Sequence, residues 1–252
     1  VGVVDSPTTI AGCTMRTSVR STFIIGAVRN SPFTFVDTTL VGGTHNGFEV
    51  DGSLDSSPVS FTRCAFLGST VLHAMVVTGF VADSPLTLTD STLTGGQEAI
   101  KFSAAVSGSP MTISGSALRS TSATGYSALH VTGALDSSPV TLLDTKVTTD
   151  VAAGAGDGLH FASTVTDSPV SCTGVAITSG DAGVRFAGAM TRSNATVTNG
   201  AFDVTATGVA FSGAVDTGEI LVREVQVGGT PAYSVDLTGP WTGSNVTVCR
   251  YW

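Results

Sequence analysis

Two histidines stand out among the residues that could take part in chemistry. His130 and His160 each occupy the middle of a triplet whose outer residues are apolar, and Lys101 and Arg185 occupy similar triplets before and after them. Successive side chains of a β-strand point to opposite faces, so these four residues lie opposite their apolar neighbours. If the four strands are neighbours, they form one outward row. Such a row could bind an acidic sugar, or it is an ordinary solvated row of strand residues.

Two long loops precede the histidines. Residues 119–127 and 148–157 are insertions at equivalent positions of an internal repeat. Insertions of this kind gather on one face and often form the binding surface of a repeat protein. We therefore expect Tyr126, Asp150 and Asp157 beside His130 and His160. The candidate ligand-binding residues are Lys101, Tyr126, His130, Asp157, His160 and Arg185.

No acidic cluster occurs in the full outward row of these strands, which comprises Glu49, Val76, Lys101, His130, His160, Arg185, Ala210 and Asp236. Polysaccharide lyases and hydrolases built on a similar scaffold need one, either to bind calcium or to pair a general acid with a general base. No Ser/His/Asp signature, phosphate loop or dinucleotide fingerprint occurs. We expect no catalytic residue, no cofactor and no metal site, and an acidic cluster on one face of the folded chain would favour an enzyme instead.

The elements that position these residues come from the repeat. Its marker, Ser-Pro, recurs about every 25 to 30 residues and is followed by three short strands with recurring apolar positions. Stacked coils place like residues above like, and parallel connections are right-handed. The sequence predicts an all-β, right-handed parallel β-helix of about nine to ten coils of roughly 25 residues, with three strands per coil, as one domain over 1–252. The Ser-Pro pairs begin at Ser6, Ser31, Ser57, Ser84, Ser109, Ser138 and Ser168.

The four cysteines are not expected to pair. Cys13 and Cys64 occupy equivalent positions two coils apart, a separation of about 9.6 Å. A disulfide requires Cα atoms within about 7 Å. Cys172 occupies an inward apolar position, three coils from Cys249 and on the opposite face of the strand.

The outward positions of the strand after Ser-Pro carry a row of Thr and Ser. This row resembles the Thr-x-Thr arrays of ice-binding β-solenoids, although Val36, Leu143 and Arg223 interrupt its second column. Threonine also suits any exposed β-face. The aspartates near the corners recur on non-adjacent coils, which is typical of turns rather than of calcium sites. The first column contains Thr9, Thr34, Ser60, Thr87, Thr112, Thr141, Ser171, Thr196 and Thr247.

Composition indicates an extracellular protein. Charged residues make up 12% of the chain and the net charge is −8. Nucleic acids and anionic membranes attract clustered Lys and Arg, so neither is an expected partner. No apolar run approaches the roughly 20 residues that span a bilayer. The sequons at Asn194 and Asn245 are expected to be exposed and are candidate glycosylation sites.

Three segments carry a family resemblance: SPVTLLDT at 138–145, DSPLTLTDSTLTGG at 83–96 and GLHFASTVTDSP at 158–169. The order and spacing of residues in these segments resemble those of the dispersed gene family surface proteins of trypanosomes. The resemblance implies a very long extracellular β-solenoid that is attached to a membrane and adheres to host components without catalysis. Because the membrane segments of such a protein are missing here, we expect an excerpt or processed part of a longer chain.

The sequence thus favours a non-enzymatic extracellular or cell-surface β-solenoid that acts in adhesion or ligand presentation, or as a structural filament unit. Its expected partners are host or matrix glycans or proteins, or copies of itself stacked end to end. A carbohydrate-active enzyme is the second hypothesis, and an ice-binding protein is the third.

Overall fold

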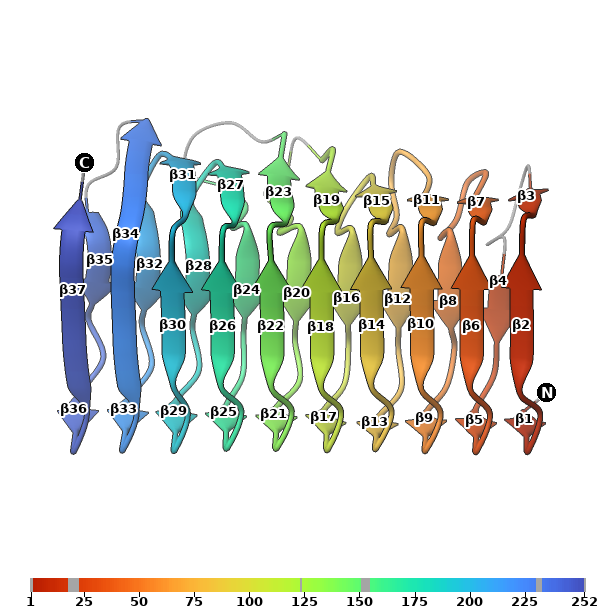
Figure 1. Cartoon of the computed structure of the whole chain (residues 1–252), viewed down its shortest axis with the longest axis horizontal. Helices are drawn as coiled ribbons and strands as arrows, with labels where there is room; N and C mark the ends of the chain where they lie inside the picture. The colour runs from red at the N-terminus through yellow and green to blue at the C-terminus, as the bar shows by residue number, and fades with distance from the viewer. Residues whose placement is uncertain (1, 18–22, 123, 151–154, 230–232, 252) are drawn as a thin grey trace.

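The computed structural model describes residues 2–17, 23–122, 124–150, 155–229 and 233–251. Their regular structure consists of β-strands that wind into a parallel β-solenoid of about 9 turns, with about 26 residues per turn and three parallel sheets. The predicted fold class is therefore confirmed. In Figure 1 the chain runs up the near face, over the top and down the far face while it advances from N to C, which is a right-handed coil.

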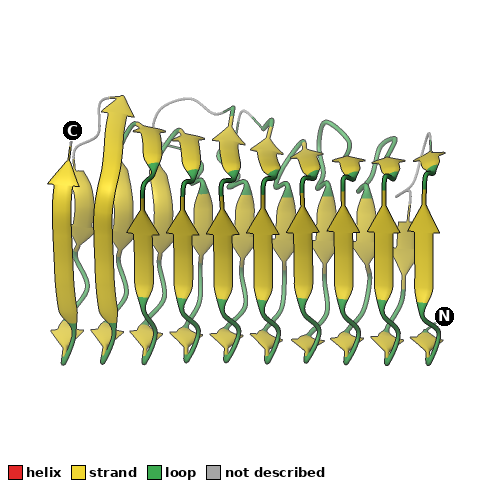
Figure 2. Ribbon diagram, in the orientation of Figure 1, coloured by secondary structure: helices red, strands yellow, loops and turns green. Residues whose placement is uncertain are grey.

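Successive coils add strands to all three sheets, and Figure 2 shows the strands stacked along the axis. The sequence patterns indicated three strands per coil. The structure has the same three and, in addition, a two-residue strand just before Ser-Pro. These short strands form the ten-stranded sheet: β1 Val3–Val4, β5 Val28–Arg29, β9 Leu54–Asp55, β13 Val81–Ala82, β17 Val106–Ser107, β21 Leu135–Asp136, β25 Val165–Thr166, β29 Met190–Thr191, β33 Val215–Asp216 and β36 Trp241–Thr242.

The 18-stranded sheet combines two strands from most coils, the one that follows Ser-Pro and the next one along the chain. The strands after Ser-Pro are β2 Thr8–Ala11, β6 Phe33–Val36, β10 Val59–Thr62, β14 Leu86–Thr89, β18 Met111–Ser114, β22 Val140–Leu143, β26 Val170–Thr173, β30 Ala195–Thr198, β34 Glu219–Gly229 and β37 Asn245–Tyr251. The second set comprises β3 Thr14–Arg16, β7 Thr39–Val41, β11 Ala65–Leu67, β15 Thr92–Gly95, β19 Ala117–Ser120, β23 Lys146–Thr149, β27 Ala176–Ser179 and β31 Ala201–Val204.

The nine-stranded sheet carries the predicted outward row. Its strands are β4 Phe23–Ile25, β8 Phe48–Val50, β12 Met75–Val77, β16 Ile100–Phe102, β20 Leu129–Val131, β24 Leu159–Phe161, β28 Ala182–Phe186, β32 Thr207–Phe211 and β35 Tyr233–Leu237.

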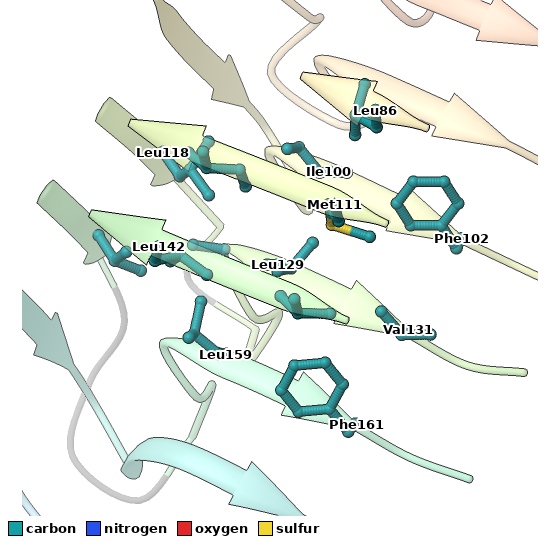
Figure 3. Packing of buried hydrophobic residues seen from close by; sticks show 14 of the residues in the cluster. Leu86, Ile100, Phe102, Met111, Leu118, Leu129, Val131, Leu142, Leu159 and Phe161 are labelled. Carbon is teal, nitrogen blue, oxygen red and sulfur yellow. The ribbon is translucent and has the colours of Figure 1, made fainter. Parts of the chain in front are cut away.

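Aliphatic and aromatic columns fill the space between the sheets. Ile100 pairs in register with Leu129, which pairs with Leu159, so equivalent side chains stack on successive coils (Figure 3). Two aromatic groups add to this core. Phe161, Phe186 and Phe211 stack with centroids 5.0 and 4.8 Å apart. A compact cluster near the N-terminal end contains Phe35, Phe48, Phe61 and Phe66.

Two corners of each coil adopt the left-handed backbone conformation. One lies just before Ser-Pro and the other just after the strand that follows it, as at Asp83 (φ 46°) and Asp90 (φ 50°). Asp, Asn and Gly tolerate this conformation best. Gly108 and Gly115 occupy the same two corners on the next coil, with φ of 58° and 56°. The turn aspartates thus have a backbone role, in agreement with the sequence interpretation.

The serine of Ser-Pro forms a ladder inside the solenoid. From Ser31 to Ser168, each of these side chains accepts a hydrogen bond from the backbone N–H of the serine on the preceding coil, and its hydroxyl donates to the carbonyl two residues earlier. Ser138 is fully buried; its Oγ accepts from Ser109 N at 2.9 Å and donates to Asp136 O at 2.8 Å. The ladder satisfies the polar backbone where proline interrupts the sheet.

Replacing Ser138 by alanine is expected to lower the free energy of unfolding by about 1–3 kcal/mol, because the N–H of Ser109 loses its acceptor in a buried position. Chemical denaturation measures the effect. Ser137→Ala is the matched control, since that neighbouring side chain is exposed. Equal stability of the two variants would contradict the role of the ladder.

All four cysteines are free, as the repeat phase predicts. Cys172 pairs in register with Leu142 and Val197 inside the core, where burial raises the pKa of its thiol to about 12. Cys64 replaces a serine of a second ladder, and its N–H donates to Ser91 Oγ at 3.0 Å. The predicted Thr and Ser row also has the expected register, with Thr87 beside Ser60 and Thr112.

Asn194 and Asn245 are both exposed. The side-chain oxygen of Asn194 accepts a hydrogen bond from Glu219 N at 2.9 Å. The predicted exposure of both sequons is therefore confirmed, and glycosylation at either position stays a prediction.

Candidate ligand-binding site

Four consecutive strands of the nine-stranded sheet bring the predicted cationic row together. Lys101 on β16 pairs in register with His130 on β20, which pairs with His160 on β24 and then with Arg185 on β28. The flanking apolar residues of each strand point into the core, so these four side chains face outward. All four are half-buried.

A cleft of about 540 Å³ lies over this row. Its lining includes all six residues that the sequence singled out: Lys101, Tyr126, His130, Asp157, His160 and Arg185. The ends of the two long loops supply one wall, with Gly125 and Tyr126 from one loop and Gly156 and Asp157 from the other. Glu98 and Asp181 add two further carboxylates.

Glu98 is the most enclosed charged group of the cleft, with a side chain that is 0% exposed. One carboxylate oxygen lies 3.0 Å from His130 Nδ1 and 3.4 Å from Lys101 Nζ, and the other lies 2.8 Å from His73 Nδ1. Burial alone would raise its pKa. The hydrogen bond from His130, the close contact with His73 and the nearby charge of Lys101 outweigh burial and hold the pKa far below its ordinary value of 4.5.

Asp157 makes equivalent contacts with the row two coils further along. Its carboxylate lies 3.1 Å from His160 Nδ1 and 3.0 Å from Arg185 Nε, and it accepts a hydrogen bond from Ala182 N at 3.1 Å. Burial would raise its pKa, but the hydrogen bond from His160 and the charge of Arg185 hold it below the ordinary value of 3.8. Arg185 also pairs with Asp181 at 2.7 Å.

The two carboxylates fix the imidazole rings. His130 and His160 stack with centroids 4.9 Å apart and an interplanar angle of 18°. Because Glu98 and Asp157 each hold an Nδ1 atom, neither ring can turn freely about its side-chain bonds. The cleft therefore presents a rigid array of polar groups, which costs little conformational entropy when a ligand binds.

The predicted loop residues have different environments. Tyr126 lies in the cleft, where its hydroxyl accepts a hydrogen bond from Gln97 Nε2 at 3.3 Å. Asp150, expected beside the histidines, instead pairs with Arg119, with 3.0 Å between Asp150 Oδ2 and Arg119 Nε. This pair lies in a separate hollow on the outer face of β15, β19 and β23. The expectation for Asp150 is therefore wrong, because a cation on the neighbouring strand holds it on that face.

Sequence reasoning missed the acids that surround the row. Glu98 and Asp181 lie at the corner just before β16 and β28, and neither was among the predicted site residues. Glu98 and Asp157 both stand three residues before an outward cation or imidazole. That common spacing could have identified the two carboxylates as partners of the row. Only the geometry of the coil, however, shows that the corner places them beneath it. In the described part of the chain, no three His, Cys, Asp or Glu residues are grouped as metal ligands would be.

Both carboxylates predict a loss of stability in acid. A group with a lowered pKa stabilises the fold fully above its unfolded pKa, and that contribution is lost as the pH falls toward the folded value. The free energy of unfolding should fall below about pH 4.5, with a slope of up to about 1.4 kcal/mol per pH unit for each carboxylate. Denaturant titrations of the wild type and of a Glu98→Gln, Asp157→Asn double variant measure this. The variant should show the shallower slope, and equal slopes would contradict the assignment.

Comparisons with known proteins identify no family for this chain. No family model matches it, and no curated protein matches its sequence. Among solved structures it is similar to PfbA, a surface adhesin of Streptococcus pneumoniae, with a TM-score of 0.30 and 12% identity. The match covers 87% of this chain and 63% of the adhesin chain. A likeness of this degree carries no information on function, and the resemblance to the trypanosome family stays a prediction. None of the described residues belongs to a helix long and apolar enough to cross a membrane.

Proposed function

We propose that the chain is a non-enzymatic, extracellular or cell-surface β-solenoid that binds glycans through the cleft over β16, β20, β24 and β28. The observation that carries the proposal is the pair of buried carboxylates, Glu98 and Asp157, beneath four outward donor side chains. Burying two carboxylates is costly unless they are paired and hydrogen-bonded, and the same contacts hold their partners in place. Fixed donors and acceptors along an open cleft are well suited to the many hydroxyl groups of a sugar.

Two properties of the acids support binding without turnover. A glycoside hydrolase needs a general acid whose pKa is raised, so that the carboxyl keeps its proton near neutral pH. Glu98 and Asp157 have lowered pKa values instead. Each is also committed to at least two nitrogen partners, which leaves neither available as a proton donor to a leaving group.

A carbohydrate-active enzyme is the second candidate, and one observation favours it. Each imidazole has a carboxylate on Nδ1, an arrangement that orients histidine as a general base in many enzymes. A base of this kind could remove a proton from a sugar ring in a lyase. In addition, Glu98, Asp157 and Asp181 gather around the row, and an acidic cluster on one face is what an enzyme on this scaffold would need.

A glycan array that is probed with the purified protein, with divalent ions and with chelator, tests both candidates. We expect binding without shortened products when any bound glycan is incubated with the protein and analysed by mass spectrometry. A His130→Ala, His160→Ala double variant should lose at least about tenfold in affinity, which is about 1.4 kcal/mol. His45→Ala, an exposed histidine of an earlier coil, should bind like the wild type. Cleavage would contradict the non-enzymatic assignment, and a complete absence of binding would contradict the glycan proposal.

A further inference from the structure

We infer that the cleft selects neutral, hydroxyl-rich oligosaccharides and discriminates against acidic ones. The inference rests on the proposed function of glycan binding and names the class of glycan. The row Lys101, His130, His160 and Arg185, taken alone, would instead suggest a site for an acidic sugar.

The charges of the lining residues carry the inference. Two cationic side chains, Lys101 and Arg185, line the cleft together with three carboxylates, Glu98, Asp157 and Asp181. The imidazoles apart, these five groups carry a surplus of one negative charge. The whole chain carries −8, which also repels an anionic ligand at long range.

The pairing of the cations leads to the same conclusion. Lys101 contacts Glu98 at 3.4 Å, and Arg185 contacts Asp157 at 3.0 Å and Asp181 at 2.7 Å. A ligand carboxylate or sulfate would have to approach a guanidinium that two acids already neutralise. It would also approach those acids, and repulsion between like charges in a partly buried site is unfavourable.

A hydroxyl group has no such conflict. It can donate to the carboxylate of Asp181, whose side chain is 29% exposed, and accept from the neighbouring guanidinium of Arg185 at the same time. The four donor side chains lie on four successive coils, and their row extends over roughly 14 Å for strands about 4.8 Å apart. A cleft of this length accommodates an extended oligosaccharide, and the half-buried ring of Tyr126 lies along its wall.

The test uses pairs of oligosaccharides in which a neutral and an acidic member share the same backbone, measured by calorimetry at low and at high salt. Suitable probes are lacto-N-neotetraose with its sialylated form, and the methyl ester of tetragalacturonate with the free acid. We expect any pair that binds to favour its neutral member by at least about tenfold, with little dependence on salt because no net charge is neutralised.

Asp181→Asn removes the surplus negative charge while it keeps the size of the side chain. This variant should narrow the difference between the neutral and the acidic member of a pair. Asp5→Asn makes the same change of charge at an exposed corner of the first coil, and it should leave the difference unchanged. Thermal melting of both variants checks that they fold.

Three outcomes are distinguishable. Neutral members that bind more tightly support the inference. Acidic members that bind more tightly, with an affinity that falls steeply in salt, would overturn the inference and leave glycan binding intact. If no member of any pair binds, and the array also shows no binding, the proposed function falls and this inference falls with it.

Discussion

Glu98→Ala is expected to lower the free energy of unfolding by about 3 kcal/mol at neutral pH. Removal of one partner from a buried ion pair leaves the other charges uncompensated, at a cost of about 3–5 kcal/mol. We expect the lower end of this range because Lys101, whose ammonium group lies 3.4 Å from Glu98, is partly exposed and can be solvated by water after the change. The variant should also weaken glycan binding, since His130 loses the carboxylate that fixes its ring.

The matched control for this variant is Glu219→Ala. The side chain of Glu219 is exposed on β34, so its loss should change stability by no more than about 0.5 kcal/mol. Chemical denaturation gives both values, and the difference between Glu98→Ala and the wild type should shrink as the pH falls below about 4.5. A small effect that is independent of pH would show that Glu98 contributes neither stability nor order to the cleft.

The fold was predictable because the repeat encodes it at many positions at once. Ser-Pro at Ser84 and Ser109 sets the phase, and the alternation in Leu86-Thr87-Leu88 sets which side chains point inward. An error at one coil would conflict with the coils on either side. The two-residue strands, such as β13, were missed because two residues are too few to show a period.

The site was predictable only in part, for a geometric reason. Alternation along a strand placed Lys101, His130, His160 and Arg185 in one row, and insertion length placed Tyr126 and Asp157 beside it. Corner residues have no such periodicity, since their direction depends on the turn. Glu98 and Asp181 therefore could not be assigned to the cleft. The same lack of a rule for turn direction produced the wrong expectation for Asp150, which pairs with Arg119 instead.

Phe61→Ala is expected to have the largest effect on the core. The side chain of Phe61 is 0% exposed, and its ring centroid lies 4.7 Å from that of Phe66, 5.0 Å from that of Phe35 and 5.4 Å from that of Phe48. Truncation would lose these contacts and leave a cavity, at a cost of about 3–5 kcal/mol. Phe80→Ala is the matched control, because that side chain is 45% exposed and should cost far less.

The region destabilised by Phe61→Ala should be confined to a few coils, unlike the response of a globular protein with a single core. Each coil contacts only its neighbours, so a local loss of packing need not spread through the molecule. Hydrogen exchange of the Phe61→Ala variant should accelerate in β6, β10 and β14, which pair directly around the cavity. Exchange in β26 and β30, several coils away, should stay close to that of the wild type. Uniform acceleration along the chain would indicate that the coils unfold as one cooperative unit, and it would contradict the nearest-neighbour account of their stability.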